Sequence, residues 1–228
     1  MALLSRLTTT YSAAADPERA AGMRAYMRNQ FEFLGIATPA RRALSRKVLA
    51  GEPAPDEAAL HDVALACWEL PEREYQYFAC DLLAAHARTL SPDFLTTVRH
   101  LVTAKSWWDT VDALAAAVVG RIVAGYPAAV ATMDGWLADG NMWLNRTAIL
   151  HQLTYKQDTD TERLFRYCLA QAGHGDFFVR KAIGWALRQY AWTDPAAVHR
   201  FVTAHAAELS PLSIREATKN FSRLGVPR

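Results

Sequence analysis

The stretch NRTAILHQL (145–153) overlays VRKAIGWAL (179–187) at an offset of 34 residues, and IREATKNFS (214–222) follows 35 residues further on. The alanine near the middle of each stretch is a convenient marker, and earlier parts of the chain carry the same marker. The six markers are Ala43, Ala79, Ala113, Ala148, Ala182 and Ala217. A nearly constant period of about 35 residues is typical of stacked helical repeats. The sequence therefore predicts an all-α solenoid of about six helical pairs.

The composition agrees with this fold and indicates a single domain in the cytoplasm. The chain has 228 residues, of which 51% are hydrophobic, so we expect one continuous domain over residues 1–228. No segment approaches the roughly 18 unbroken apolar residues of a membrane span. The N-terminal segment lacks a basic region followed by a long apolar one, so a signal peptide is not expected. Three widely spaced cysteines fit buried thiols of a cytoplasmic protein: Cys67, Cys80 and Cys168.

The repeat register also assigns side chains to faces. Positions one and five after the marker form an apolar stripe that we expect to be buried: Leu44 and Val48, Leu114 and Val118, Ile149 and Leu153, Ile183 and Leu187. The position two before the marker is basic in four units: Arg41, Arg146, Arg180 and Arg215. Equivalent positions of a solenoid line up, so these residues predict a basic track. It is either a phosphate-binding surface or a solvated face with local ion pairs.

The segment WWDTVD (107–112) interrupts this basic face with an acid. In a helix Trp108 and Asp112 are one turn apart and share a face. An aromatic plane beside an anion can bind a cation. An anion would weaken phosphate binding on this basic face, so we expect Asp112 to stabilise positive charge on the ligand instead. The alternative is a core tryptophan beside an aspartate that pairs with an arginine.

At these residues the sequence resembles the bacterial DNA alkylation repair glycosylases of the AlkD type, which are built from HEAT-like repeats. The resemblance is carried by five segments in family order: MRAYMRNQFEFLGIATPARR (23–42), KSWWDTVDAL (105–114), NMWLNRTAILHQLTYKQ (141–157), FFVRKAIGWALRQYA (177–191) and LSPLSIREA (209–217). It implies a curved array of HEAT-like pairs with a basic concave face. In GIATP, Ala37 stands where the family often has a polar residue, which puts one backbone contact in doubt.

The resemblance also implies a site and a reaction. The catalytic residues of the family fall on Trp108, Asp112, Arg146 and Trp185. The implied reaction is hydrolysis of the N-glycosidic bond of cationic alkylated purines, 3-methyladenine and 7-methylguanine, in double-stranded DNA. It implies a monofunctional monomer in a bacterial cytoplasm, associated with the nucleoid, that acts without a cofactor and without base flipping. The expected DNA contacts are Tyr26, Thr38, Arg41, Arg42, Lys156, Arg180, Lys181, Arg188 and Arg215.

Two other functions remain open on the sequence. The first is a catalytically inactive HEAT-like protein that binds DNA structures, in which Trp108 and Asp112 only pack. The second is a protein-binding scaffold, the commonest use of helical solenoids. A metal site is not expected, because the seven histidines are scattered without helical i, i+4 pairs.

Overall fold

The computed structural model describes residues 2–226, and these residues are helical with no β-strand. The one pairing of extended backbone found there is an isolated bridge between Glu32 and Glu72. Within the same residues, every helix is too short or too polar to cross a membrane. The prediction of an all-α fold is therefore confirmed.

The helices form two compact units that divide between Leu90 and Ser91. The sequence predicted one continuous domain. Because each pair in a repeat array contacts mainly its neighbours, such an array readily separates into blocks. Each unit is described by itself below.

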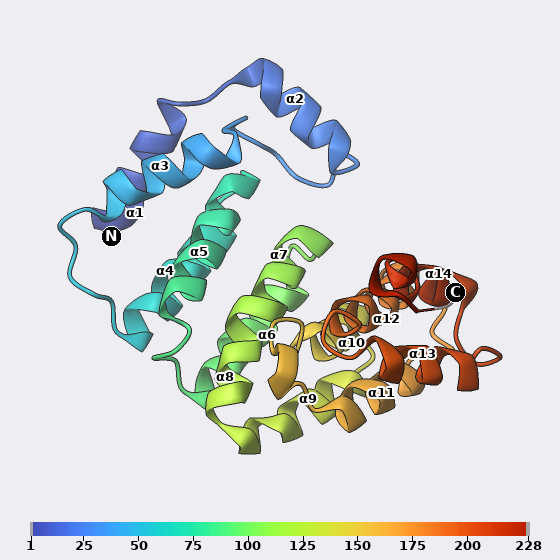
Figure 1. The fold of residues 1–228 in the computed structure, drawn as a ribbon. Coiled ribbons are helices and arrows are strands. Elements are labelled where there is room, and N and C mark those ends of the chain that lie inside the picture. Colours follow the sequence, from blue (N-terminus) through green and yellow to red (C-terminus); the bar gives the residue numbers. More distant parts are fainter. Residues whose placement is uncertain (1, 227–228) are drawn as a thin grey trace. The chain divides into compact units, whose positions relative to one another are not determined.

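The first unit holds two packed pairs of helices, and α2 stands beside them (Figure 1). Helix α1 packs against α3, and α4 packs against α5. Asp16 and Asp56 cap α2 and α4 through their carboxylates. The helices of this unit are α1 (Ala2–Ser12), α2 (Pro17–Tyr26), α3 (Thr38–Leu49), α4 (Glu57–Glu69) and α5 (Arg73–His86).

The second unit holds four helical pairs. Helix α10 packs against α7 on one side and α12 on the other, and α12 packs against α14 (Figure 1). Helices α6, α9, α11 and α13 are the second members of these pairs. Their bounds are α6 (Leu95–Thr103), α7 (Trp108–Leu114), η2 (Ala115–Val119), α8 (Gly120–Gly125), α9 (Val130–Leu137), α10 (Met142–Leu150), α11 (Thr161–Ala170), α12 (Phe177–Tyr190), α13 (Pro195–Ala204) and α14 (Pro211–Ala217). Short 3-10 turns lie at η1 (Pro92–Phe94), η3 (Pro127–Ala129), η4 (Lys156–Asp158) and η5 (Phe221–Leu224).

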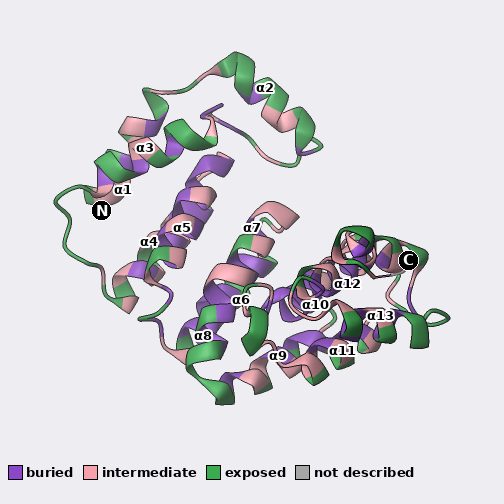
Figure 2. Ribbon diagram, in the orientation of Figure 1, coloured by how far each residue is buried: buried purple, intermediate pink, exposed green. Residues whose placement is uncertain are grey.

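The marker alanines fall on corresponding helices of successive pairs: α3, α5, α7, α10, α12 and α14. Most of the predicted apolar stripe is buried, whereas Leu44 and Leu153 are only partly so. Figure 2 shows buried and exposed residues alternating along the helices, with α5 mostly buried. Ala113 is exposed, unlike its counterparts Ala148 and Ala182. Equivalent register positions are therefore not equally buried.

Helix α7 runs without a break through η2 into α8, and η2 is a π-helical turn. Such turns hold one more residue than an α-turn and occur often next to functional sites. Gly120 follows it immediately, and a Cβ there would lie 2.3 Å from the carbonyl oxygen of His151. Glycine therefore lets α8 approach the end of α10, where the Tyr155 hydroxyl donates to the Gly120 carbonyl.

Candidate active site

Three marker helices of the second unit, α7, α10 and α12, form a cavity of about 350 Å³. Two tryptophans, two phenylalanines, three cations and one carboxylate line it: Trp108, Asp112, Arg146, Phe177, Phe178, Lys181, Trp185 and Arg188. All four residues that the sequence predicted as catalytic are among them. Two of the predicted DNA contacts, Lys181 and Arg188, line it as well.

Local sequence fixes where these helices begin. Asn141 caps α10, its side chain accepting from the Trp143 amide at 2.9 Å. Asp176 caps α12 and accepts from the Phe178 amide. Polar caps of this kind satisfy the free N–H groups of a first helical turn. They set the positions of Arg146 and Phe177 one turn into α10 and at the first residue of α12, respectively.

Asp112 and Arg146 form a two-bond ion pair between α7 and α10. The Arg146 Nε donates to Asp112 Oδ1 at 2.7 Å, and Nη2 donates to Oδ2 at 2.8 Å. The remaining terminal nitrogen, Nη1, donates to the Phe178 carbonyl on α12. The side chains are 4% and 13% exposed for Arg146 and Asp112, so the pair lies at the floor of the cavity.

Burial dominates the acidity of Asp112. It raises the pKa of this carboxyl above its usual value, because a charged carboxylate is disfavoured away from water. The hydrogen bonds and the charge of Arg146 lower the pKa but do not cancel the effect of burial, and Asp109 raises it further. The carboxylate is thus a poorly solvated anion that depends on one arginine.

A cluster of aromatic rings supports the cavity wall. Phe178, Trp107 and Trp143 contact one another, with ring centroids 5.1 Å apart for Trp107–Phe178, 5.0 Å for Trp143–Phe178 and 6.1 Å for Trp107–Trp143. Phe177 meets the edge of Phe178 at 5.4 Å but is itself 54% exposed at the cavity rim. Trp107 therefore packs with the core of this wall, while Trp108, the next residue, lines the cavity.

The expected basic track is less solvated than the repeat register indicated. Arg41 is buried against α5, where it donates to Asp81 at 2.9 Å and its guanidinium lies over Tyr77. Arg146 is buried by its pairing with Asp112, and Arg180 donates to the His174 carbonyl. The position two before the marker often faces a neighbouring helix and not solvent. Arg215 is exposed, as a solvated phosphate contact requires.

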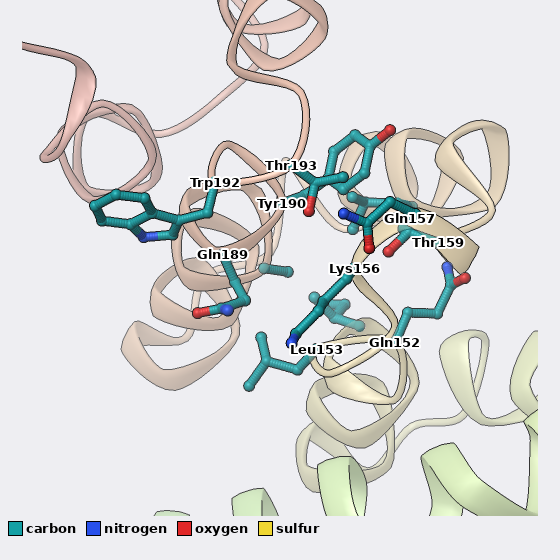
Figure 3. Close-up of a pocket in the computed structure, with 12 residues that line it drawn as sticks. Gln152, Leu153, Lys156, Gln157, Thr159, Gln189, Tyr190, Trp192 and Thr193 are labelled. Atoms are coloured by element: carbon teal, nitrogen blue, oxygen red, sulfur yellow. The ribbon is translucent and has the colours of Figure 1, made fainter. Parts of the chain in front are cut away.

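The remaining predicted DNA contacts lie elsewhere. In the first unit, Tyr26 at the end of α2, Thr38 at the start of α3, and Arg42 are exposed. In the second unit, Lys156 lines a separate cavity of about 200 Å³ at the ends of α10 and α12 (Figure 3). Glutamine amides, threonine hydroxyls and an apolar floor surround it, and no carboxylate is among its lining residues. This second cavity therefore differs from the first in having no anionic side chain in its lining.

Three residues in or beside the cavity were not predicted from the sequence. Phe177 and Phe178 line the cavity, and Glu216 on α14 pairs with Lys181 at 2.6 Å and with Arg188. Phe177 could have been found, since it precedes Lys181 by four residues and Trp185 by eight on one helical face. Glu216 occupies the same register position as Asp112, one before the marker. An acid recurring at this register position was the signal in the sequence that could have identified Glu216.

No group of three or more histidine, cysteine, aspartate or glutamate side chains is gathered for a metal ion within residues 2–226.

Comparison with known proteins identifies the family of the chain. The family model described as "DNA alkylation repair enzyme" matches residues 7–221. A solved structure described as "Predicted DNA alkylation repair enzyme from Enterococcus faecalis" is 35% identical, with a TM-score of 0.83, and the match covers 90% of this chain and 95% of that one. No curated protein compared with the sequence matches it. The chain therefore belongs to the AlkD-like family of DNA alkylation repair enzymes.

Proposed function

We propose that the protein is a monofunctional DNA glycosylase that hydrolyses the N-glycosidic bond of cationic N3- and N7-alkylated purines in duplex DNA. 3-Methyladenine and 7-methylguanine are the substrates we expect. One observation carries the proposal: the Asp112 carboxylate shares a cavity with the indoles of Trp108 and Trp185, and Arg146 fixes both of its oxygens.

The chemistry of the substrate matches these groups. Alkylation at N3 or N7 gives the purine a positive charge, so the base leaves as a neutral molecule and needs no general acid. Positive charge then develops on the deoxyribose, as in the oxocarbenium-like transition state of sugar hydrolysis. An ionised Asp112 stabilises that charge and can accept a proton from the attacking water. The indole faces of Trp108 and Trp185 attract the same cation.

Arg146 acts in this proposal chiefly through Asp112. Three of its nitrogens already donate to protein atoms, two to Asp112 and one to Phe178. A guanidinium offers five N–H groups in a planar fork, so two remain for a phosphate oxygen beside the lesion. The pairing keeps the carboxylate ionised and in one orientation, which is the preorganisation that electrostatic catalysis requires.

The lining of the cavity favours the sugar–phosphate backbone over the base edge. Three of the eight lining residues are cations suited to phosphate, and none carries the amide or hydroxyl that would both donate to and accept from the edge of an extruded base. Enzymes that flip a base read that edge by hydrogen bonds inside a pocket. We propose that cleavage occurs from the backbone side, without base flipping.

The direct experiment is release of free base from methylated duplex DNA with and without protein. Cationic 7-methylguanine and 3-methyladenine should be released, whereas hypoxanthine and uracil should not. DNA binding without any base release would leave a catalytically inactive DNA-binding protein as the function. Efficient release of uracil would contradict the mechanism, because a neutral base leaves as an anion that must be protonated or stabilised, and the proposed mechanism includes neither step.

The backbone-side mode has a separate test. Weakening the base pair at the lesion speeds enzymes that must extrude the base, because unpairing costs them less. The single-turnover rate for 7-methylguanine should therefore be the same opposite cytosine and opposite thymine. A marked acceleration opposite thymine would indicate base flipping.

A further inference from the structure

Glu216 is a buried carboxylate of α14 that reaches two cations of the cavity without lining it. Its Oε1 contacts the Lys181 amino group at 2.6 Å, and its Oε2 accepts from the Arg188 guanidinium. Lys181 and Arg188 stand four residues before and three after Trp185 on α12. One acid on the neighbouring helix therefore holds both cations that flank a tryptophan of the site.

Gly184 makes this contact possible. A Cβ at this position would lie 2.5 Å from the Cβ of Glu216 and 2.7 Å from the Ser213 carbonyl oxygen. Any larger residue would push α14 away from α12. The Ser213 hydroxyl, which donates to the Arg180 carbonyl at 2.9 Å, ties the same helices together. The distance from Glu216 to the two cations is thus set by close packing.

The negative charge of Glu216 only partly neutralises the positive charges of Lys181 and Arg188. Burial disfavours the charged form of Glu216, but the hydrogen bonds from Lys181 and Arg188 outweigh it, and the net pKa of Glu216 is lowered. The carboxylate is therefore ionised at neutral pH. It offsets one of two positive charges and occupies one N–H of each cation. The other N–H groups of Lys181 and Arg188 remain available to the cavity that both residues line.

We infer that Glu216 is a positioning residue: it orients Lys181 and Arg188 toward the phosphates beside the lesion, and it reduces their affinity for the phosphates of undamaged DNA. The inference rests on the proposed function. Without Glu216 the two side chains would bind phosphate more strongly and with less direction. Affinity for any duplex would then rise, while the fraction of complexes with correctly placed cations would fall.

The test is Glu216→Gln, which keeps the shape of the side chain but removes its charge. Affinity for undamaged duplex should rise, and the slope of log affinity against log salt should steepen by about one. The single-turnover excision rate at saturating protein should fall by about tenfold or more, opposite in direction to binding. Loss of affinity and rate together, with a lowered melting temperature, would mean that Glu216 only supports the fold.

Glu216→Asp separates charge from reach and also serves if the glutamine variant fails to fold. The shorter side chain keeps the anion but cannot span to both cations, so the salt slope should stay unchanged while the excision rate falls. Wild-type rates in this variant would overturn the inference. The matched control is Asp134→Asn on α9, which removes another ion-paired carboxylate, bonded to Arg166 and Tyr167, outside the cavity. It should leave both measurements within about twofold.

The binding measurements are independent of the proposed reaction. If the wild-type protein released no base from methylated duplex, the proposed function would fail. The salt slopes of the Glu216 variants would still show whether this carboxylate restrains Lys181 and Arg188. An unchanged affinity and slope in Glu216→Gln would overturn the inference whatever the reaction.

Discussion

The carboxylate of Asp112 and the guanidinium of Arg146 are joined by two hydrogen bonds across a separation of 34 residues, one repeat of the chain. The pair links α7 to α10 at the floor of the candidate active site. Arg146 holds the Asp112 carboxylate in one orientation and favours its ionised form, and Asp112 in turn occupies two N–H groups of Arg146.

Replacing Asp112 with asparagine removes the anion but keeps its shape. Base excision should fall by roughly 10²-fold or more, equivalent to about 3 kcal/mol of transition-state stabilisation. Affinity for duplex DNA should hold or rise, since a negative charge leaves a basic cavity. Single-turnover release of 7-methylguanine measures the first effect and a binding titration the second. Asp109→Asn is the control, and equal effects at both positions would make the segment structural.

The pH profile should report the raised pKa of Asp112. Activity requires the ionised carboxylate, so excision should decline as pH falls, with its midpoint above the usual range for an aspartate. In Arg146→Lys the two-bond fork is lost, and the midpoint should move to still higher pH. The rate of each protein is measured after subtraction of spontaneous depurination. A midpoint that does not move in Arg146→Lys would show that Arg146 does not control the carboxylate.

Neighbouring arginines of α3 should behave differently. Arg42 is 60% exposed, so Arg42→Ala should reduce the slope of log affinity against log salt by about one, as expected for one lost phosphate contact. Arg41 is 5% exposed and bonded to Asp81, so Arg41→Ala should instead lower the melting temperature. Salt titrations and thermal melts of the two variants make the comparison. An unchanged slope in Arg42→Ala would place the phosphate contacts elsewhere.

His151 should make the protein sensitive to acid. It is fully buried, and burial lowers the pKa of its imidazole to about 4. An unfolded histidine titrates near 6.5, so this residue's contribution to stability is complete above about pH 6.5 and is lost as pH falls toward 4. The loss amounts to at most about 3 kcal/mol. Urea unfolding at pH 7 and 4.5 should show a smaller difference for His151→Phe than for wild type. His100→Gln, at an exposed position, should match the wild type.

The fold was predictable because its signal repeats. Alanine at a period of 34 to 36 residues identified the packed helices, and Leu114, Ile183 and Leu187 lie in the core as their register predicts. Ala113 shows the limit of this approach, because it is exposed although Ala148, Ala182 and Ala217 at the same register position are buried. The π-helical turn after Leu114 left no visible mark on the sequence pattern.

The site was predictable in its members but less so in their contacts. Trp108 and Asp112 share a helical face, and the family resemblance supplied Arg146 and Trp185. The register placed Arg146 on the expected basic track, yet its guanidinium turns toward the acid one repeat earlier. Whether a long side chain points to solvent or to a neighbouring helix depends on what that neighbour presents. Arg41 with Asp81 is a second instance.

The π-helical turn at Ala115–Val119 lets this helix absorb a change of one residue in chain length. A π turn holds one more residue than an α turn over about the same rotation, so deleting one residue here would return the turn to α geometry and leave Asp112 facing Arg146. A deletion between Trp108 and Asp112 would instead rotate one of them by about 100° relative to the other. Among relatives, a one-residue gap inside the wide turn is therefore compatible with an unchanged site, whereas a gap between these two residues would signal an altered function.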